Sequence, residues 1–466
     1  MVRNLVVIGG DAAGMSAASQ ARRLLGVDEL AITVLERGDT TSYAACGIPY
    51  WVAGLVPHRS DLVARRAEVF RDKQQIDVRL HHEATAIDTD ARTVSVRDLT
   101  SGAGLTLSYD DLLIATGAQQ VRPPVDGLDT PGVFGVQTLG DGQRILDAMA
   151  QRSPRHAVVV GGGYIGLEMA EAMQLQGLDV TLIDLAPQPM TTLEPELGAL
   201  IADAIRTMGI DLRLQTPLSG IEAGADGWVR AVTTPGGEIA TDLVIIGTGV
   251  RPRSELAAAA GIPVGPSGGI VTDDRQRTPV DRVWAAGDCA ETLHRVSQLP
   301  VSFALGTIAN KQGRIAGLNL GGGEGRFPGV LGTAVTKIHD LEIARTGLSV
   351  REAKAAGLSV EVSSITAGTR AHYYPQSSEM TVLLVIESGS GRLLGGQIVG
   401  GLGAGKRIDV LATALWNRMQ VEDLVQMDLA YAPPFSPVWD PVLTAARSAA
   451  GNAGRDAGKD AGPNAR

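Results

Sequence analysis

The chain has few cysteines, few aromatic residues and no long apolar run. Two of its 466 residues are cysteine, and 4% are aromatic. Two cysteines far apart in sequence do not build a disulfide framework, which favours a reducing compartment. No apolar run approaches the ~18 residues that span a bilayer, and the first expected strand begins at about Leu5, which leaves no room for a signal peptide. We therefore expect a cytoplasmic protein that does not enter a membrane.

Basic residues are also in deficit. The 41 Lys and Arg against 51 Asp and Glu give a net charge of −10, whereas a sequence-independent nucleic-acid binder shows a basic stripe. The 44% hydrophobic and 20% charged residues are typical of a globular protein. At roughly one domain per 150 residues, the length predicts about three domains.

The first 36 residues match a dinucleotide-binding βαβ unit. A buried strand at Asn4–Ile8 leads into Gly9-Gly10-Asp11-Ala12-Ala13-Gly14, a helix from Met15 to about Leu25 and a strand at Ala31–Leu35 that ends on Glu36. The glycines let a pyrophosphate reach the helix N-terminus, and the acid binds a ribose hydroxyl. The motif departs from its usual form at Asp11, which stands where the second glycine is normally found.

Residues 155–184 repeat this strand–loop–helix–strand pattern, with all three glycines present. The strand Ala157–Val160 precedes Gly161-Gly162-Gly163-Tyr164-Ile165-Gly166, followed by a helix at Leu167–Gln176 and a strand at Val180–Ile183 that ends on Asp184. A carboxylate at this strand end binds the ribose 2′-hydroxyl and repels a 2′-phosphate. The motif therefore predicts that NADH is preferred over NADPH.

Cys46 lies in the segment Ser42–Tyr50, between the two nucleotide motifs. Gly47 and Pro49 indicate a turn, and a helix from Ile48 with Pro49 in its first turn would place the sulfur at a positive helix end that stabilises a thiolate. The sequence thus predicts a redox-active thiol at Cys46. We expect Cys289 to be a small packing residue.

The remaining segments supply further expected elements. We expect helices over Asp61–Gln75 and Ser302–Asn319, and strands over Val78–His82, Thr93–Val96, Leu112–Ile114, Leu243–Ile246 and Val283–Ala286. The tail from Ser448 to Arg466 has few large apolar residues to bury, so we expect it to be disordered.

Taken in order, these motifs resemble the FAD-dependent pyridine nucleotide–disulfide oxidoreductases. The resemblance rests on the two glycine fingerprints, on Ala115-Thr116-Gly117, on Gly287-Asp288 and on the third region. It implies an α/β fold with two Rossmann-like (three-layer ββα) nucleotide-binding domains and a C-terminal α+β dimerisation domain. The implied boundaries are 1–122 and 248–325 for the FAD domain, 123–247 for the NAD domain, 326–447 for dimerisation and 448–466 for the tail.

The motifs and the resemblance together assign FAD and NADH as cofactors, with NADPH possible. The residues expected to bind them are Gly9, Gly10, Ala13, Gly14, Glu36, Arg37, Ser42, Thr116, Gly117, Gly161, Gly163, Tyr164, Ile165, Gly166, Glu168, Asp184, Gly249, Gly287 and Asp288. Tyr164 matches the family's gate residue at the nicotinamide pocket, and Glu168 lines that pocket.

Within the family, the chain resembles the single-cysteine branch. The residues four positions from Cys46 are Ser42 and Tyr50, and no histidine follows His372, so the Cys-x4-Cys pair and C-terminal His of the dithiol reductases are missing. Ala12 stands where NADH peroxidases and oxidases carry a histidine. The segments around Cys46, at His372–Pro375 and at Ala430–Pro437 resemble coenzyme A-disulfide reductases.

The resemblance implies a homodimer that reduces coenzyme A disulfide, or a related disulfide or persulfide. Cys46 would be catalytic, with Tyr431 and Tyr373 or Tyr374 of the partner subunit supporting the leaving thiolate. We expect Arg22, Arg23 and Arg65 to contact substrate phosphates, and we expect no metal site. Two alternatives remain: an NADH oxidase or peroxidase that cycles Cys46 through sulfenic acid, and a flavoprotein redox sensor or electron carrier.

Overall fold

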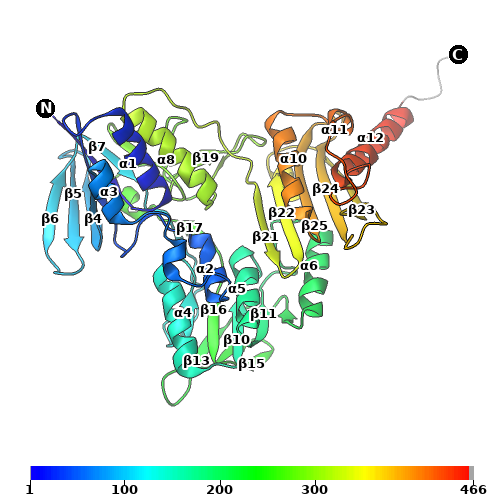
Figure 1. The fold of residues 1–466 in the computed structure, drawn as a ribbon, viewed down its shortest axis with the longest axis horizontal. Coiled ribbons are helices and arrows are strands. Elements are labelled where there is room, and N and C mark those ends of the chain that lie inside the picture. Colours follow the sequence, from blue (N-terminus) through cyan, green and yellow to red (C-terminus); the bar gives the residue numbers. More distant parts are fainter. Residues whose placement is uncertain (1, 461–466) are drawn as a thin grey trace.

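The computed structural model describes residues 2–460, and for residues 452–460 it describes the backbone alone. Figure 1 shows three lobes, each built around its own sheet. The first lobe combines residues 3–114 with residues 283–320, the second is formed by the middle of the chain, and the third is C-terminal. This is the expected α/β architecture with two nucleotide-binding folds and a third domain.

The first lobe has a parallel five-stranded sheet between helices and a small antiparallel sheet (Figure 1). Its strand order is β18(Val283–Ala285)-β7(Asp111–Ile114)-β1(Arg3–Ile8)-β2(Leu30–Leu35)-β3(Asp77–Arg79). Leu5 and Val7 face α1 (Ala12–Leu24), while Val6 and Ile8 pack against the antiparallel sheet. That sheet comprises β4 (His82–Asp88), β5 (Thr93–Asp98) and β6 (Gly104–Ser108). Both faces are buried, which explains the continuously apolar strands.

Helix α8 (Gly306–Leu320) joins this lobe from three hundred residues away by packing closely on α1. A Cβ added at Gly313 would lie 2.2 Å from the carbonyl oxygen of Ala13, and one at Gly317 would lie 2.2 Å from that of Ala17. Only glycine permits such backbone contact. The contact holds the returning chain against the first nucleotide loop.

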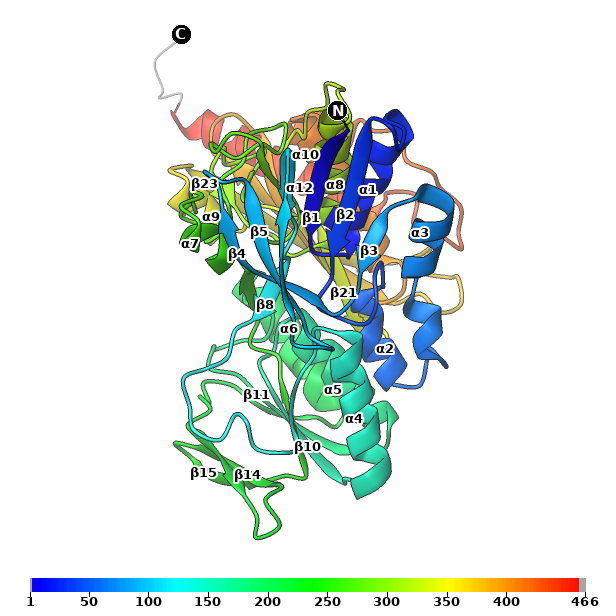
Figure 2. The ribbon, with the colours of Figure 1, turned by 90° about the vertical axis from the view of Figure 1, so that its left-hand side faces the viewer.

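The second lobe repeats this plan. Its parallel sheet has the order β12(Asp211–Arg213)-β11(Asp179–Ile183)-β10(His156–Val160)-β16(Leu243–Ile246)-β9(Val133–Gly135). Figure 2 shows α4 (Leu139–Arg152) and α5 (Tyr164–Leu175) on one side and the antiparallel strands β14 (Val229–Thr234) and β15 (Gly237–Ala240) on the other. Strand β13 (Gly220–Ala223) completes that small sheet, and α6 (Pro195–Thr207) precedes β12.

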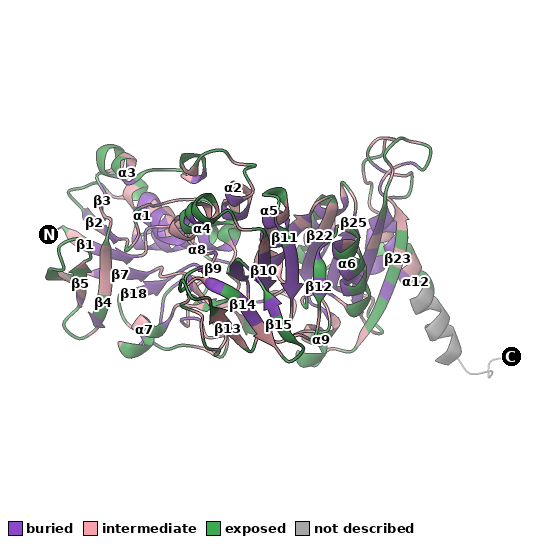
Figure 3. Ribbon diagram, turned by 90° about the horizontal axis from the view of Figure 1, so that it is seen from below, coloured by how far each residue is buried: buried purple, intermediate pink, exposed green. Residues whose placement is uncertain are grey.

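The third lobe is an antiparallel sheet covered by helices. Its strand order is β21(Ala334–Ile338)-β22(Leu341–Gly347)-β25(Leu393–Gly400)-β24(Glu379–Glu387)-β23(Val360–Gly368). One face packs on α10 (Ala404–Trp416), α11 (Val421–Val425) and α12 (Pro441–Asp460). Residues of the other face, among them Ile343 and Leu383, share a core with the second lobe. Figure 3 shows the buried strands of the second and third lobes side by side.

Short elements complete the chain. They are a 3₁₀ turn at Ala45–Gly47, α2 (Ile48–Val52), a 3₁₀ turn at Arg59–Leu62, α3 (Ala67–Gln74), the pair β8 (Ala118–Gln120) and β17 (Val250–Pro252), α7 (Glu255–Ala259), the pair β19 (Thr292–Leu293) and β20 (Pro300–Val301), and α9 (Val350–Ala355).

Three expected elements differ from the structure. The helix expected over Asp61–Gln75 is interrupted because the Ala64 amide donates to the Ser42 carbonyl at 2.8 Å, which holds this stretch extended beside the cysteine segment. The strand expected at Val78–His82 ends at Arg79, since His81 adopts a left-handed φ of 56°. The helix expected from Ser302 begins at Gly306, after the short strand β20.

The disorder expected from Ser448 is wrong for the first part of the tail. Helix α12 continues to Asp460, and Ala449 is buried in the core of the third lobe together with Ala445 and Ala446. Alanine has the highest helix propensity, and its small side chain fits into this core. Because the segment has no run of large apolar residues, its sequence pattern did not indicate burial. Residues 461–466 lie outside the described part of the chain.

Candidate functional site

The two glycine loops have the geometry that the fingerprints predict. Gly9 and Gly161 have φ values of 109° and 103°, which favour glycine. The third glycines, Gly14 and Gly166, lie so close to the carbonyl oxygens of Gly9 and Gly161 that a Cβ would overlap them. Each loop therefore turns directly from a strand into a helix N-terminus that can receive a phosphate.

The strand-end acids lie at these loops. Glu36 accepts a hydrogen bond from the Gly10 amide at 2.8 Å, and Asp184 accepts one from the Gly162 amide at 2.5 Å. Each carboxylate is thus placed beside the second residue of its glycine loop, where a ribose of the bound dinucleotide would lie. Around Gly163, at the start of α5, no heavy atom lies within 4 Å of an added Cβ.

A third segment, Gly287-Asp288, reaches the first glycine loop from α8's side. A Cβ at Gly287 would lie 2.8 Å from the Cβ of Ala13. Asp288 Oδ1 is buried and has no hydrogen-bond partner among the residues described, and burial raises the pKa of Asp288 to about 6. An orphaned buried oxygen beside a glycine loop fits the polar ribityl or pyrophosphate portion of FAD, so the residues present fit that cofactor.

The other residues predicted to bind FAD lie in the segments that follow β2, β7 and β16. Thr116 Oγ1 donates to the Arg253 carbonyl at 2.6 Å, and Gly117 has open space beside it. Ser42 donates its amide to the Gly10 carbonyl at 3.3 Å, while the charge of Arg37 acts on Tyr43. Gly249 lies at the edge of the NAD-side lobe, where its carbonyl accepts from the Val121 amide at 2.9 Å.

Asp11 connects the glycine loop to the cysteine segment. Although it caps the N-terminus of α1, its side chain makes no capping bond. Its Oδ1 instead accepts the Tyr43 amide at 3.1 Å. Burial, together with the nearby Glu36 and Asp288 carboxylates, raises the pKa of Asp11 to about 7. The sequence marked Asp11 only as a departure from the motif, and that departure was the available signal for this contact.

Cys46 is exposed, in the 3₁₀ turn that precedes α2. The predicted helix from Ile48 is present, with Pro49 in its first turn. The predicted stabilisation of a thiolate is wrong in this arrangement: partial burial raises the pKa of the Cys46 thiol, and the Glu168, Asp288 and Asp11 carboxylates add to that effect. A helix of five residues supplies too small a dipole to offset these charges.

The nicotinamide-side residues lie at the start of α5. Tyr164 is its first residue, and burial raises the pKa of its phenol. Tyr164 and Ile165 pack against the core of the second lobe. Burial also raises the pKa of Glu168, whose carboxylate acts on both Cys46 and Tyr50. Gln176, just beyond α5, donates to the Val52 carbonyl at 3.0 Å, so α5 packs directly on α2, the helix that follows the Cys46 turn.

The predicted catalytic tyrosines lie in loops of the third lobe: Tyr373 and Tyr374 between β23 and β24, and Tyr431 between α11 and α12. Tyr373 and Tyr431 are exposed at 65% and 47%, and Tyr374 is half-buried. Their loops are joined by a bond from the Ala371 amide to the Pro433 carbonyl at 3.3 Å. A hydrogen bond with Tyr373 raises the pKa of the Tyr431 phenol. Of the two candidate tyrosines, Tyr373 is thus the one that affects the Tyr431 phenol.

The three predicted arginines differ in availability. Arg22 donates to the carbonyls of Leu25, Gln74 and Gln75, so its guanidinium is engaged in structure. Arg23 is exposed. Arg65 lies 5.2 Å over the Phe70 ring, in the segment bound to Ser42 near the cysteine turn.

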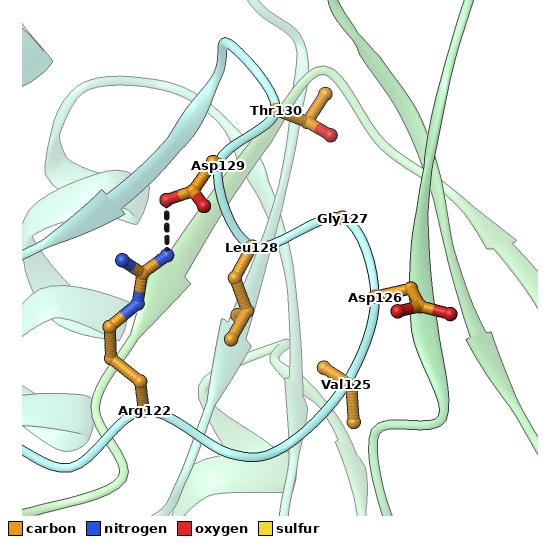
Figure 4. Close-up of a pocket in the computed structure, with 7 residues that line it drawn as sticks. All are labelled: Arg122, Val125, Asp126, Gly127, Leu128, Asp129 and Thr130. Atoms are coloured by element: carbon orange, nitrogen blue, oxygen red, sulfur yellow. Dashed lines mark hydrogen bonds and ion pairs between the residues drawn. The ribbon is translucent and has the colours of Figure 1, made fainter.

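One further hollow in the surface lies away from the predicted site residues. A hollow of about 510 Å³ is lined by residues 122 and 125–130, where Arg122 and Asp129 form an ion pair at 2.7 Å (Figure 4). None of the predicted site residues lines it. Across residues 2–451, whose side chains the structure describes, we find no cluster of His, Cys, Asp and Glu suited to a metal ion. No helix in the described range combines the length and apolar character needed to cross a membrane.

Two dinucleotide-binding folds that converge on one exposed thiol define a flavin- and nicotinamide-dependent redox protein. The chain belongs to the pyridine nucleotide-disulphide oxidoreductase family, whose pattern matches residues 3–313; the family's dimerisation domain matches residues 333–441. It is an enzyme that uses FAD and a pyridine nucleotide.

Three similar proteins share nearly the whole chain. An NAD(P)H sulfur oxidoreductase (CoA-dependent) of Pyrococcus furiosus is 40% identical over 93% of this chain and 96% of its own. A coenzyme A disulfide reductase of Staphylococcus haemolyticus is 29% identical over 93% and 96%. The structure of a water-forming NADH oxidase from Lactobacillus brevis bound to NADH has a TM-score of 0.92 and 28% identity, covering 98% of this chain and all of that one.

We predict that Asp11→Asn stabilises the FAD-free protein more at pH 8 than at pH 5. The raised pKa of about 7 means that the folded chain holds this proton more tightly than the unfolded chain. The stability it provides is present at acidic pH and is lost as the pH rises through 7. Asparagine keeps the acceptor for Tyr43 and does not ionise, so urea unfolding should show a gain of about 1–3 kcal/mol at pH 8. Asp28→Asn, at an exposed position, is the control; equal gains at both pH values would contradict the prediction.

Proposed function

We propose that this FAD-dependent NAD(P)H oxidoreductase reduces coenzyme A disulfide, or a related disulfide or persulfide, through Cys46. The supporting observation is that Cys46 lies exposed in a turn bonded to the first glycine loop and packed on the second nucleotide lobe. Cys289, the other cysteine, is fully buried. The likeness to a CoA-dependent NAD(P)H sulfur oxidoreductase and to a coenzyme A disulfide reductase supports the choice of substrate.

FAD and the nicotinamide supply hydride and electron transfer when bound. The residues expected to hold FAD are those of the first glycine loop with Glu36 and Asp288, and those expected to hold the nicotinamide nucleotide are the second loop with Tyr164, Glu168 and Asp184. The Cys46 thiolate attacks one sulfur of the substrate, which forms a mixed disulfide and releases one thiolate. Two-electron reduction of the mixed disulfide then releases the second thiolate and restores Cys46.

The leaving thiolate requires a proton donor, and we assign Tyr431 with Tyr373 to that role. Both phenols lie on the third domain and not beside Cys46 of the same chain, so they would act on the Cys46 of a partner subunit in a homodimer. The exposed apolar side chains around them, Phe435, Val438 and Trp439, supply a surface that a second subunit would cover. Arg65 and Arg23 remain candidates for the substrate phosphates.

The second candidate is an NADH oxidase or peroxidase in which Cys46 cycles through sulfenic acid. The likeness to the water-forming NADH oxidase favours it, and an exposed thiol meets its chemical requirement. Ala12, where oxidases and peroxidases carry a histidine, and the paired tyrosines of the third domain favour disulfide reduction instead.

We predict that Cys46→Ser abolishes disulfide reduction while flavin reduction by NADH persists. Serine cannot form the mixed disulfide, so the loss should exceed about 1,000-fold. Anaerobic NADH oxidation with a panel of disulfides and persulfides would measure it, alongside oxygen consumption without them. Cys289→Ser is the matched control. Faster turnover of the wild-type enzyme with oxygen alone than with any sulfur substrate would favour the oxidase.

Tyr431→Phe should lower disulfide turnover by about 100-fold or more, because a positioned proton donor contributes about 10²- to 10⁴-fold. The flavin half-reaction with NADH should not change, since the phenol acts after it. Stopped-flow reduction and steady-state turnover separate the two steps. Tyr374→Phe, at the half-buried neighbour, is the control; parallel loss of both steps in Tyr431→Phe would make the residue structural.

Asp184→Ala should reduce the preference for NADH over NADPH. The wild-type carboxylate repels a 2′-phosphate, and its removal should change the ratio of the two kcat/KM values by about 10- to 100-fold. Asp179→Ala, at the exposed start of the same strand, is the control. A wild-type enzyme with the higher kcat/KM for NADPH would contradict the proposed role of Asp184.

A further inference from the structure

The segment 184–194, between β11 and α6, lies against the second glycine loop. Met190 donates its amide to the Gly162 carbonyl at 2.8 Å, and a Cβ added at Gly162 would lie 3.3 Å from the Cα of Pro189. Asp184, the first residue of the segment, accepts the Gly162 amide. The segment therefore forms one side of the loop that is expected to receive the nicotinamide nucleotide.

Local structure alone does not hold this segment in place. Residues 184–194 contain neither helix nor strand. Met190 has a left-handed φ of 52°, a conformation that is uncommon for residues other than glycine and persists where surrounding contacts fix it. The contacts inside the segment include a bond from the Gln188 side chain to the Leu193 carbonyl at 3.0 Å. The conformation around Met190 thus depends on contacts from outside the segment as well.

The third domain supplies such a contact through Arg345 of β22. This arginine is 4% exposed, and its Nη1 donates to the Thr192 carbonyl at 2.9 Å. Its Nη2 donates to the Gly347 carbonyl at 2.8 Å and to the Glu352 carboxylate at 2.7 Å. The carboxylate compensates the charge of the buried guanidinium, and the three partners together fix its orientation.

A second set of contacts holds the end of the segment. Gln397 of β25 is 1% exposed, and its side-chain oxygen accepts the Glu194 amide at 2.7 Å. The Glu194 carboxylate accepts the amide of Val350, at the start of α9, at 2.8 Å. Figure 1 shows α6, which follows Glu194, beside β25. The segment is thus bonded to the second glycine loop near its middle and to the third domain near its end.

We propose that Arg345 is a positioning residue for nicotinamide nucleotide binding: by holding the Thr192 carbonyl, it keeps the segment 184–194 against Gly162 and so raises the affinity of the second glycine loop for the adenosine half of NADH. The inference rests on this loop being the nicotinamide nucleotide site, and not on the choice of sulfur substrate. It gives the third domain a part in cofactor binding by its own chain, in addition to any contact with a partner subunit.

The variant Arg345→Lys separates this role from folding. Lysine keeps a positive charge beside Glu352, so the carboxylate stays paired. A single ammonium cannot replace the planar guanidinium that reaches Thr192 and Glu352 together. A segment that is no longer held must become ordered when the nucleotide binds, which lowers the affinity. FAD binding in the first lobe, and flavin reduction once NADH is bound, should not change.

The test is calorimetric binding of ADP-ribose, which carries the adenosine half of NADH without its nicotinamide, to the FAD-loaded enzyme. We expect Arg345→Lys to raise the Kd by about 10-fold. Gln397→Met, which preserves volume but removes the acceptor of the Glu194 amide, should also raise it. The double variant should raise the Kd by less than the product of the two single effects, because both release the same segment.

Stopped-flow reduction of the flavin supplies a second readout. In Arg345→Lys the limiting rate at saturating NADH should equal that of the wild type, while the NADH concentration that gives half of that rate should rise in parallel with the Kd of ADP-ribose. Arg392→Lys is the matched control, because Arg392 forms a two-bond pair with Glu387 inside the third domain. It should leave the Kd unchanged.

An unchanged Kd in Arg345→Lys and Gln397→Met would overturn the inference. A loss of bound FAD in step with the loss of ADP-ribose affinity would also overturn it, since that result would make Arg345 a residue of general stability. Binding of ADP-ribose requires no disulfide turnover. An enzyme that reduces no disulfide but shows the expected Kd values would therefore contradict the proposed function and support the role of Arg345.

Discussion

The direct backbone contact between α1 and α8 is the constraint on which the redox site depends. Residues 306–320 return to the first lobe only because Gly313 and Gly317 leave no side chain between the two helices. With α8 in place, the turn at Gly287 is pressed against Ala13, and the orphaned oxygen of Asp288 lies beside the first glycine loop. The site expected to hold FAD is thus assembled from two segments nearly three hundred residues apart. A side chain in place of either glycine would push α8 away from α1 and thereby separate these two segments, without itself contacting the cofactor.

Negative charge collects around the sulfur. Asp11, Asp288 and Glu168 all raise the pKa of the Cys46 thiol, and Asp11 and Glu36 also act on Tyr43. These carboxylates belong to the glycine loop, to the segment before α8 and to α5. Three different parts of the fold therefore lie near the cysteine turn. A thiol in such a field forms a thiolate reluctantly, and its reactivity is therefore sensitive to whichever contacts orient or neutralise the surrounding acids.

The elements predicted correctly are those that are determined by residues close together in the sequence. The apolar strands, the two glycine loops, the acids that follow β2 and β11, and the start of α2 all occupy their expected places. The failures have non-local causes. Residues 63–66 leave helical geometry because the Ala64 and Arg65 amides bond to the Ser42 carbonyl, and Ala449 is buried only because α12 closes the third domain.

The site was less predictable than the fold for the same reason. The glycines and acids that would hold the dinucleotides are recognisable from their spacing in the sequence. The ionisation of Cys46 instead depends on carboxylates that are far from it in the sequence and follow no recognisable spacing. Asp11 could be noticed as a departure from the glycine pattern. The bond from Thr336 to Glu168 spans 168 residues and joins two motifs that are each unremarkable in sequence, so only the packed structure reveals it.

Helix α5 is the element where these observations meet. Its first turn follows the nucleotide loop, one flank packs on the helix that follows Cys46, and the other is bonded along its length to the third domain. A displacement of β21 would therefore move Glu168 relative to both the nicotinamide pocket and the thiol. Since the exposed tyrosines belong to the same domain as β21, a subunit interface built on that domain would act on the redox centre from two directions: through residues offered to the partner, and through the strand that bonds to α5 in its own chain.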